Sequence, residues 1–368
     1  NSLTPNSLTP IRLTLLSPKP MAAPVFAWDP TITPDSPQAQ PRRCDWPVSL
    51  LRLDGPDVLR FLHGQTSQAL EQAQSGQWLS TCCITPTARL RALAEVLVDG
   101  EGATLVIRAG DGEAVRSALD RVLFPADAVR LGPLAPGLLV ESIGVECDPQ
   151  APAAGRWAAL GAPDIGWRLG SHLTLLPAGQ PLPASLADLP PLSPREQEHW
   201  RLGQGLPVVP NEVNEDTNPF ELGLADRVSL NKGCYVGQET LAKLATYDGV
   251  KRQLRRWICV EPPAQGTGLA AGTKLWAAAG EIADEIADGP ADTGEAAGDS
   301  AQRAGVITSS FSIDGGRVWI GLALVRRQAL EAARLRAGEG AGAPWLELSL
   351  PERFVAPPVG AGSAASRP

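Results

Sequence analysis

The sequence predicts an α+β protein whose last third is all-β. Three observations lead to this prediction. Helical and strand-like apolar patterns are mixed from residue 50 onward, and a capping box marks one helix start near residue 193. From residue 252, short β-type runs are separated by Gly and Asp turns. The 368 residues are enough for two or three domains.

The first 44 residues are predicted to be a disordered leader. They are rich in Pro, Ser and Thr and open with the pentapeptide Asn-Ser-Leu-Thr-Pro repeated twice. Met21 is the only methionine in the chain, so we interpret it as the natural start and the residues before it as an upstream artefact. An organelle transit segment is the alternative, although Arg12 and Lys19 are the only basic residues before residue 42.

The next elements follow from turn and capping signals. A helix is expected after the turn at 54–57, where Val58, Leu59 and Leu62 begin an apolar helical pattern. The apolar runs 94–98 and 103–108 predict a hairpin with a four-residue loop. Asp111 is then expected to cap a helix with one apolar face, formed by Val115, Ala118, Leu119 and Val122.

The clearest helix start is the capping box Ser193-Pro194-Arg195-Glu196, whose helix is expected to end at Gly203 or Gly205. The runs 252–260 and 306–325 predict strands, with a hairpin turn at 314–316. Residues 261–304 are rich in Ala, Gly and acids and are predicted to be a solvated insertion, and residues 356–368 a disordered tail.

Charge and hydropathy argue against two classes of partner. The net charge is −8, and seven acidic residues fall within 281–299, so the rest of the chain is almost balanced. Stable nucleic-acid binding needs a broad basic excess, and the basic residues at 251–256 are interpreted as a solvated strand edge. No apolar stretch is long enough for a membrane span, and we expect a cytoplasmic protein without a membrane partner.

The six cysteines form no CxxC pair, and no two of the three histidines are spaced i, i+4. The sequence therefore predicts no metal site and scattered free thiols. Cys82, Cys83, Cys147 and Cys259 sit in apolar runs and are expected to be buried. Cys234 is expected to be accessible, because its neighbours are polar and glycine-rich.

The segment 230–240 places an amine, a thiol, a phenol, an amide and a carboxylate around two glycines. It predicts a tight turn that leads into a helix near Gly237, with Gly233 and Gly237 allowing φ > 0 or close approach to a ligand. Lys232 and the positive helix end are both expected to lower the pKa of the Cys234 thiol.

The sequence Lys-Gly-Cys-Tyr-x-Gly-Gln-Glu at 232–239 resembles the signature of the YgfZ family, folate-binding relatives of the glycine-cleavage T-protein. The segments Phe-Leu-His-Gly-Gln-Thr-Ser at 61–67 and Thr-Pro-Thr-Ala-Arg at 85–89 agree with it. The longer run from Asn231 to Gly249 resembles the cyanobacterial and plastid branch. The resemblance covers about residues 45–350, interrupted by the acidic insertion.

The resemblance implies a T-protein-like (GcvT-like) pseudo-symmetric α+β body at 45–249, with tetrahydrofolate or a folate derivative in a central channel. A C-terminal β-barrel domain would follow at 250–355, containing the insertion 261–304. The implied function is that of an accessory protein for iron–sulfur cluster assembly or repair. Its transient clients would be iron–sulfur enzymes, including tRNA-modifying ones.

The resemblance also implies a set of site residues. Cys234 would be the reactive thiol and Lys232 its activator. The folate-binding residues would be Tyr235, Gln238, Glu239, Gly233, Gly237 and Arg201. Arg89 is equally well explained as a folate contact or a structural ion-pair partner. What Cys234 handles stays open between a cluster iron, a mixed disulfide and a one-carbon unit.

One position departs from the T-protein pattern. Gly203 stands where the T-protein has an acidic residue that grips the pterin, so either pterin recognition is weaker here or Gln204 substitutes.

A tetrahydrofolate-dependent aminomethyltransferase is the enzyme alternative. Its chemistry needs a positioned carboxylate. The T-protein has an acidic pair in the strand where this chain has Ala94-Glu95, and it lacks a cysteine at the position of Cys234. Both differences favour the YgfZ reading. His63 and His199 are interpreted as structural imidazoles.

Overall fold

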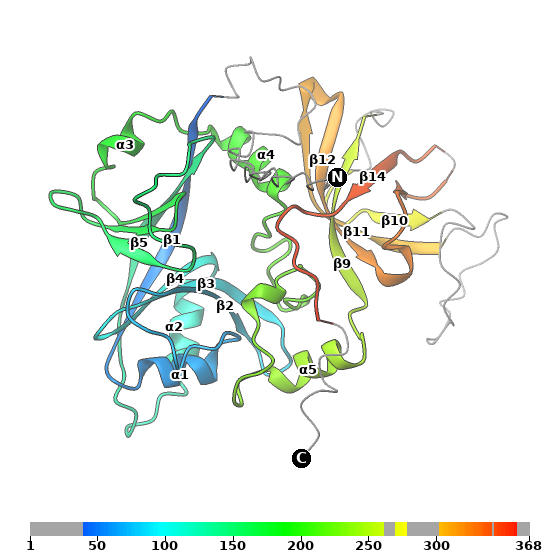
Figure 1. Cartoon of the computed structure of the whole chain (residues 1–368). Helices are drawn as coiled ribbons and strands as arrows, with labels where there is room; N and C mark the ends of the chain where they lie inside the picture. The colour runs from blue at the N-terminus through cyan, green and yellow to red at the C-terminus, as the bar shows by residue number, and fades with distance from the viewer. Residues whose placement is uncertain (1–39, 261–268, 278–301, 341, 359–368) are drawn as a thin grey trace, which may run out of the picture.

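The computed structural model describes residues 40–260, 269–277, 302–340 and 342–358. Figure 1 shows an open sheet with two helices on one side of the molecule and a β-barrel on the other, with α4 (Pro194–Gln204) between them. The predicted α+β class with a C-terminal barrel is therefore confirmed.

The sheet of the body has eight strands, and every neighbouring pair is antiparallel. In spatial order they are β2 (Trp78–Ile84), β3 (Leu90–Val98), β4 (Gly102–Gly110), β1 (Arg42–Asp54), β5 (Arg130–Ile143), β8 (Leu173–Pro177), β7 (Trp167–Leu169) and β6 (Trp157–Ala159). The predicted hairpin is the β3–β4 pair, in which Val98 lies opposite Ala103.

Two helices bury their apolar faces against the sheet, α1 against β4 and α2 against β1 and β5. In α1 (Val58–Gln65) the buried side chains are Val58, Phe61 and Leu62. In α2 (Gly112–Asp120) the Asp111 carboxylate accepts the N–H groups of Glu113 and Ala114, as predicted. Val122 lies beyond the end of this helix and is 40% exposed, so its assignment to the apolar face of the helix was wrong.

The capping box at the start of α4 is confirmed. The Ser193 hydroxyl accepts the Glu196 N–H, and the Glu196 carboxylate accepts the Ser193 N–H at 2.7 Å. The helix ends at Gly205, whose φ of 69° is the left-handed conformation in which glycine costs little. A Cβ at this position would lie 2.3 Å from Pro351, so the glycine also lets the chain after the barrel pass close to α4.

The barrel closes with six antiparallel strands. In spatial order they are β10 (Lys274–Ala277), β11 (Gln302–Ile313), β12 (Val318–Arg326), β9 (Arg252–Cys259), β14 (Trp345–Ser349) and β13 (Arg334–Ala337). The predicted turn at 314–316 joins β11 and β12, with Gly315 at φ 65° and Gly316 at φ 90°. The short elements that remain are α3 (Ala184–Ala187), η2 (Ala225–Arg227), α5 (Gln238–Thr246) and η5 (Arg327–Ala329).

Two predicted boundaries differ from the structure. Strand β1 begins at Arg42, so residues 42–44 belong to the sheet and not to the leader. Strand β10 and the first residues of β11 lie inside 261–304, the predicted insertion. The four residues of β10 are too short a pattern to recognise, and they become a strand because they pair with β11 and β13 to close the barrel. The other leader and insertion residues and the tail from 359 lie outside the described residues.

The body and the barrel share one hydrophobic core. Ile84 and Leu241 of the body pack in the same buried cluster as Leu254, Ile320 and Leu322 of the barrel. After β14 the chain returns to the body, where Arg353 binds Glu141 at 2.8 Å. The contact fixes the two parts against each other. None of the helices in the described ranges is long and apolar enough to cross a membrane.

Candidate functional site

Three segments that are far apart in the sequence meet around the loop that precedes α5. The Ser229 N–H donates to Ser67 O at 2.9 Å, and the Val236 N–H donates to Gly64 O at 3.1 Å. Gly237 approaches the turn at 85–88, because a Cβ there would lie 2.7 Å from Thr85 O. The segments 61–67, 85–89 and 232–239, quoted above as separate motifs, therefore form one site.

Lys232 anchors this site. Its ammonium donates to the carbonyl oxygens of His63, Thr66 and Gln68, the last two at 2.7 and 2.8 Å. It also lies 4.1 Å from the ring centroid of Tyr235. Burial lowers the pKa of Lys232 to about 7, while the three carbonyl acceptors favour the charged form. The Lys232 amine thus contacts carbonyls at and just after the end of α1, and the ring of Tyr235. None of these contacts is with the Cys234 thiol, which Lys232 was predicted to activate.

All six cysteines lie within the described residues, and two are exposed, Cys147 and Cys234. The predicted accessibility of Cys234 is confirmed. The predicted burial of Cys147 is wrong: it lies in the loop after β5, where its Sγ is 3.4 Å from His172 Nε2. Its apolar neighbours in the sequence do not continue a strand, so they do not bury it.

The other predicted loop residues separate into two groups. Gly237 has φ 80° and forms the N-terminal end of α5, and the Gln238 amide donates to Lys232 O at 3.2 Å. Glu239 points outward and pairs with Lys243 at 2.7 Å. Tyr235 is buried in the core shared by body and barrel, and burial raises the pKa of its phenol. Its hydroxyl oxygen has no hydrogen-bond partner among the described residues.

His63 belongs to this site, although it was interpreted from the sequence as a structural imidazole and was not among the predicted site residues. Its Nδ1 accepts the N–H groups of Leu70 and Glu71 at 3.3 and 3.0 Å. Its Nε2 faces Gly233, since a Cβ there would lie 3.8 Å away. The signal was its position in the segment 61–67, which the resemblance had already marked.

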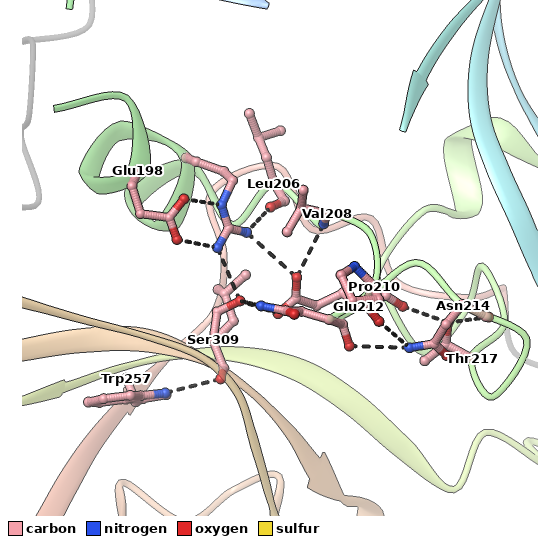
Figure 2. A network of polar contacts seen from close by, with 12 residues as sticks. Glu198, Leu206, Val208, Pro210, Glu212, Asn214, Thr217, Trp257 and Ser309 are labelled. Carbon is pink, nitrogen blue, oxygen red and sulfur yellow. Dashed lines mark hydrogen bonds and ion pairs between the residues drawn. The ribbon is translucent and has the colours of Figure 1, made fainter. Parts of the chain in front are cut away.

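Arg201 lies in a separate polar network between α4 and the barrel, with Glu198, Glu212 and Ser309. Figure 2 shows these three partners. Its guanidinium makes two bonds to Glu198, at 2.7 and 2.8 Å, and one to Leu206 O at 2.7 Å. It also donates to Ser309 Oγ at 3.0 Å and lies 3.6 Å from Glu212. Arg201 is 4% exposed, so this network holds β11 against the body.

The remaining predicted residues lie around the same junction. The Gly203 carbonyl accepts Arg256 Nη1 at 2.5 Å, and the Gln204 amide binds Glu352 at 3.2 Å. The Gly203 carbonyl is thus engaged by Arg256, and the Gln204 side chain is turned toward Glu352 through its NH₂ group. Arg89 donates to Asp216 O at 3.0 Å, a structural contact with the segment that follows α4.

A pocket of about 270 Å³ opens beside the Arg201 network. Residues of the segment 211–217 form one wall, and β11 and the turn before β10 form the other. Its polar lining residues are Asn211, Asn214, Asp216, Thr217, Arg252 and Thr308. The Thr308 hydroxyl is buried without a partner among the described residues. The pocket is thus lined largely by polar side chains.

A solved structure resembles this chain along most of its length. It is the aminomethyltransferase T of the glycine cleavage system from Bartonella henselae, with a TM-score of 0.60 and 16% sequence identity over 86% of this chain and 87% of that one. The chain has the fold of the glycine-cleavage T-protein. This confirms the T-protein-like part of the predicted resemblance, and the YgfZ branch goes beyond what this likeness shows.

A curated relative comes from Arabidopsis thaliana, a chloroplastic protein whose name assigns it provisionally to the transferases. It is 27% identical over 231 residues, which are 55% of this chain and 52% of the relative. This chain thus matches about half the length of that protein. No protein-family model matches the sequence. The cytoplasmic location stays a prediction, because the relative is chloroplastic.

Glu95, the residue matched to the acidic pair of the T-protein, is closed off from solvent. Glu95 is fully buried in β3 and accepts from Trp78 at 2.9 Å, Ser80 at 2.5 Å and Arg227 at 2.9 Å, with Arg108 at 3.5 Å. Burial would raise the pKa of Glu95, but the charges of Arg227 and Arg108 hold it below its ordinary value. The carboxylate is therefore ionised and committed to protein donors.

Proposed function

We propose that this chain is a folate-binding accessory protein for iron–sulfur cluster assembly or repair and that Cys234 is its reactive group. Iron–sulfur enzymes, among them tRNA-modifying ones, would be its transient clients. The observation that carries the proposal is the convergence of three loop segments on an exposed thiol in a T-protein fold.

The shape of the loop supports a role for the thiol. Its backbone is tied to α1 by Lys232 and to the turn at 85–88 by the close packing of Gly237. Cys234 nevertheless stays exposed between these anchors. An exposed thiol on a fixed loop suits a reaction with a second molecule, whereas four of the six cysteines of this chain are buried.

The pocket beside the Arg201 network fits part of a folate. Its carboxylate and amide groups match in kind the donors and acceptors along one edge of a pterin. Its volume of about 270 Å³ suits a ring system better than a whole folate. Asp216 would then replace the acidic residue that is missing at Gly203. When bound, tetrahydrofolate supplies N5 and N10 as carriers of a one-carbon unit.

The aminomethyltransferase alternative draws on the same fold. It needs a carboxylate that is free to direct proton movement, and Glu95 is engaged by four donors. Because Glu95 is the residue matched to the acidic pair of the T-protein, its engagement favours folate binding without aminomethyl transfer.

Equilibrium binding of tetrahydrofolate to the full chain tests the proposal, with an aminomethyltransferase assay on the same samples. Wild type, Cys234→Ala and Asp216→Asn would be compared, with the exposed Asp120→Asn as control. We expect binding by wild type, Cys234→Ala and the control, weaker binding by Asp216→Asn, and no turnover. Turnover would make the chain a T-protein-like enzyme, and absence of binding would remove folate from the proposal.

The accessory role needs its own readout. The activity of an iron–sulfur enzyme such as a tRNA-thiolating one is expected to fall in cells that lack this protein. Wild type should restore it and Cys234→Ala should not. Full restoration by Cys234→Ala would exclude the thiol from the function.

A further inference from the structure

His63 is held in one tautomer by its surroundings. Its Nδ1 accepts two backbone N–H groups, from Leu70 and Glu71. A nitrogen that accepts a hydrogen bond carries no proton, so the proton of the neutral imidazole must be on Nε2. The ring therefore presents a fixed N–H donor on its other side.

That donor is directed at the Cys234 loop and is not used by the protein. Nε2 has no hydrogen-bond partner among the described residues, and it is not one of the polar atoms that are sealed from solvent. On the loop side, a Cβ built on Gly233, directly before Cys234, would lie 3.8 Å from Nε2. Because glycine has no side chain, the space in front of Nε2 stays open.

The surroundings keep the imidazole neutral. Burial lowers the pKa of His63, and the charge of Lys232 lowers it further, while Glu71 acts in the opposite direction. Protonation would also place a second N–H against the amides of Leu70 and Glu71. At neutral pH the ring is thus a donor and not a cation.

We propose that the His63 Nε2–H binds an anionic group, such as a carboxylate, on the molecule that reacts with Cys234. The thiol and the imidazole N–H would hold that molecule at two points. Helix α5, whose N-terminal end is at Gly237, adds a positive dipole end three residues after the thiol. The inference rests on the reactive thiol of the proposed function and adds that its reactants carry negative charge.

Two substitutions of His63 test the roles of its two ring nitrogens separately. His63→Asn keeps an acceptor near the position of Nδ1 and removes the Nε2 donor. His63→Gln keeps an N–H near the position of Nε2 and gives up the acceptor for Leu70 and Glu71. If Nε2 binds the anion, only His63→Asn should weaken anion binding. If His63 is merely structural, His63→Gln should be the more damaging substitution.

The measurement is the alkylation rate of Cys234 by iodoacetate and by iodoacetamide. The full chain carries Cys147→Ser, which removes the other exposed thiol, and mass spectrometry follows the modification. The ratio of the two rate constants cancels the thiolate fraction, because both reagents attack the same thiolate. A hydrogen bond to a carboxylate in a half-exposed site should change this ratio about 3- to 10-fold.

We expect His63→Asn to lower the iodoacetate-to-iodoacetamide ratio about 3- to 10-fold and His63→Gln to keep it within about twofold of wild type. Both variants are first shown to unfold cooperatively. An unchanged ratio in His63→Asn, or an equal fall in both variants, would overturn the role of His63 and leave the thiol proposal standing. A wild-type thiol that reacts with neither reagent would overturn both.

Discussion

The ammonium nitrogen of Lys232 lies 2.7 Å from the carbonyl oxygen of Thr66, the residue directly after α1. It also donates to the carbonyl of His63, in the last turn of α1, and to that of Gln68, so it supplies a donor to one carbonyl of the helix end and to two that follow it. A lysine from position 232 thus holds the thiol loop against the end of a helix that begins at residue 58.

Lys232→Met should therefore destabilise the protein. Methionine keeps the length of the side chain but leaves three carbonyls without their donor, which we expect to cost about 1–3 kcal/mol in the free energy of unfolding. Urea denaturation measures this. The control is Lys243→Met, which removes an exposed pair with Glu239 and should change little. Equal effects of the two substitutions would contradict the anchoring role.

Lys232 should also titrate well below the ordinary value of a lysine. Its folded pKa of about 7 lies below the ordinary value of about 10.4, so between these values the unfolded chain binds more protons than the folded one. The stability that this lysine contributes should rise with pH through that window, and its burial cost should be fully present below pH 7. NMR of labelled lysine side chains gives the pKa. A titration of Lys232 near the ordinary value of about 10.4 would disprove this.

Two of the six thiols should react quickly with an aromatic disulfide reagent in the native protein, and six should react after unfolding. The fast ones are Cys147 and Cys234, because the other four are buried. Each of Cys147→Ser and Cys234→Ser should remove one fast equivalent, and the double variant should have none. A fast thiol left in the double variant would show that local opening of the fold readily exposes a buried cysteine.

Glu95→Gln should be strongly destabilising. It leaves Arg227 and Arg108 buried beside a neutral amide, and breaking a buried ion pair costs about 3–5 kcal/mol. The exposed Glu101→Gln is the control. The folded pKa of Glu95 is lowered, so its stabilisation is present above the unfolded value of about 4.3 and is lost as the pH falls further. Denaturation at pH 7 and pH 4 should show a smaller difference between wild type and Glu95→Gln at pH 4.

Gly237→Ala should destabilise the thiol loop more than Gly272→Ala. Both glycines have positive φ, 80° and 92°, which alanine adopts at a cost of about 1 kcal/mol. At Gly272 no atom lies within 4 Å of the added Cβ, whereas at Gly237 it would lie 2.7 Å from Thr85 O. Thermal unfolding compares the two. Similar shifts would mean that the turn at 85–88 moves aside without cost.

Local signals in the sequence predicted much of the fold. The Asp111 cap, the capping box at Ser193 and the glycines at 315 and 316 each specify a backbone conformation through their own atoms, and the structure has all three. Strand β10 was missed because four residues become a strand only when both barrel neighbours pair with them. Cys147 was placed in the core because the composition around it does not reveal where a strand ends.

The candidate site, like the fold, was predicted from the sequence only where it depends on local signals. The sequence by itself determined that Cys234 lies in a glycine-rich turn leading into a helix, because glycine conformations and helix starts depend on neighbouring residues. Only the tertiary structure decided that Lys232 binds carbonyls at and directly after the end of α1 and that His63 Nε2 faces Gly233. These partners are about 170 residues apart in the chain, and which polar groups meet across that distance depends on how the body packs.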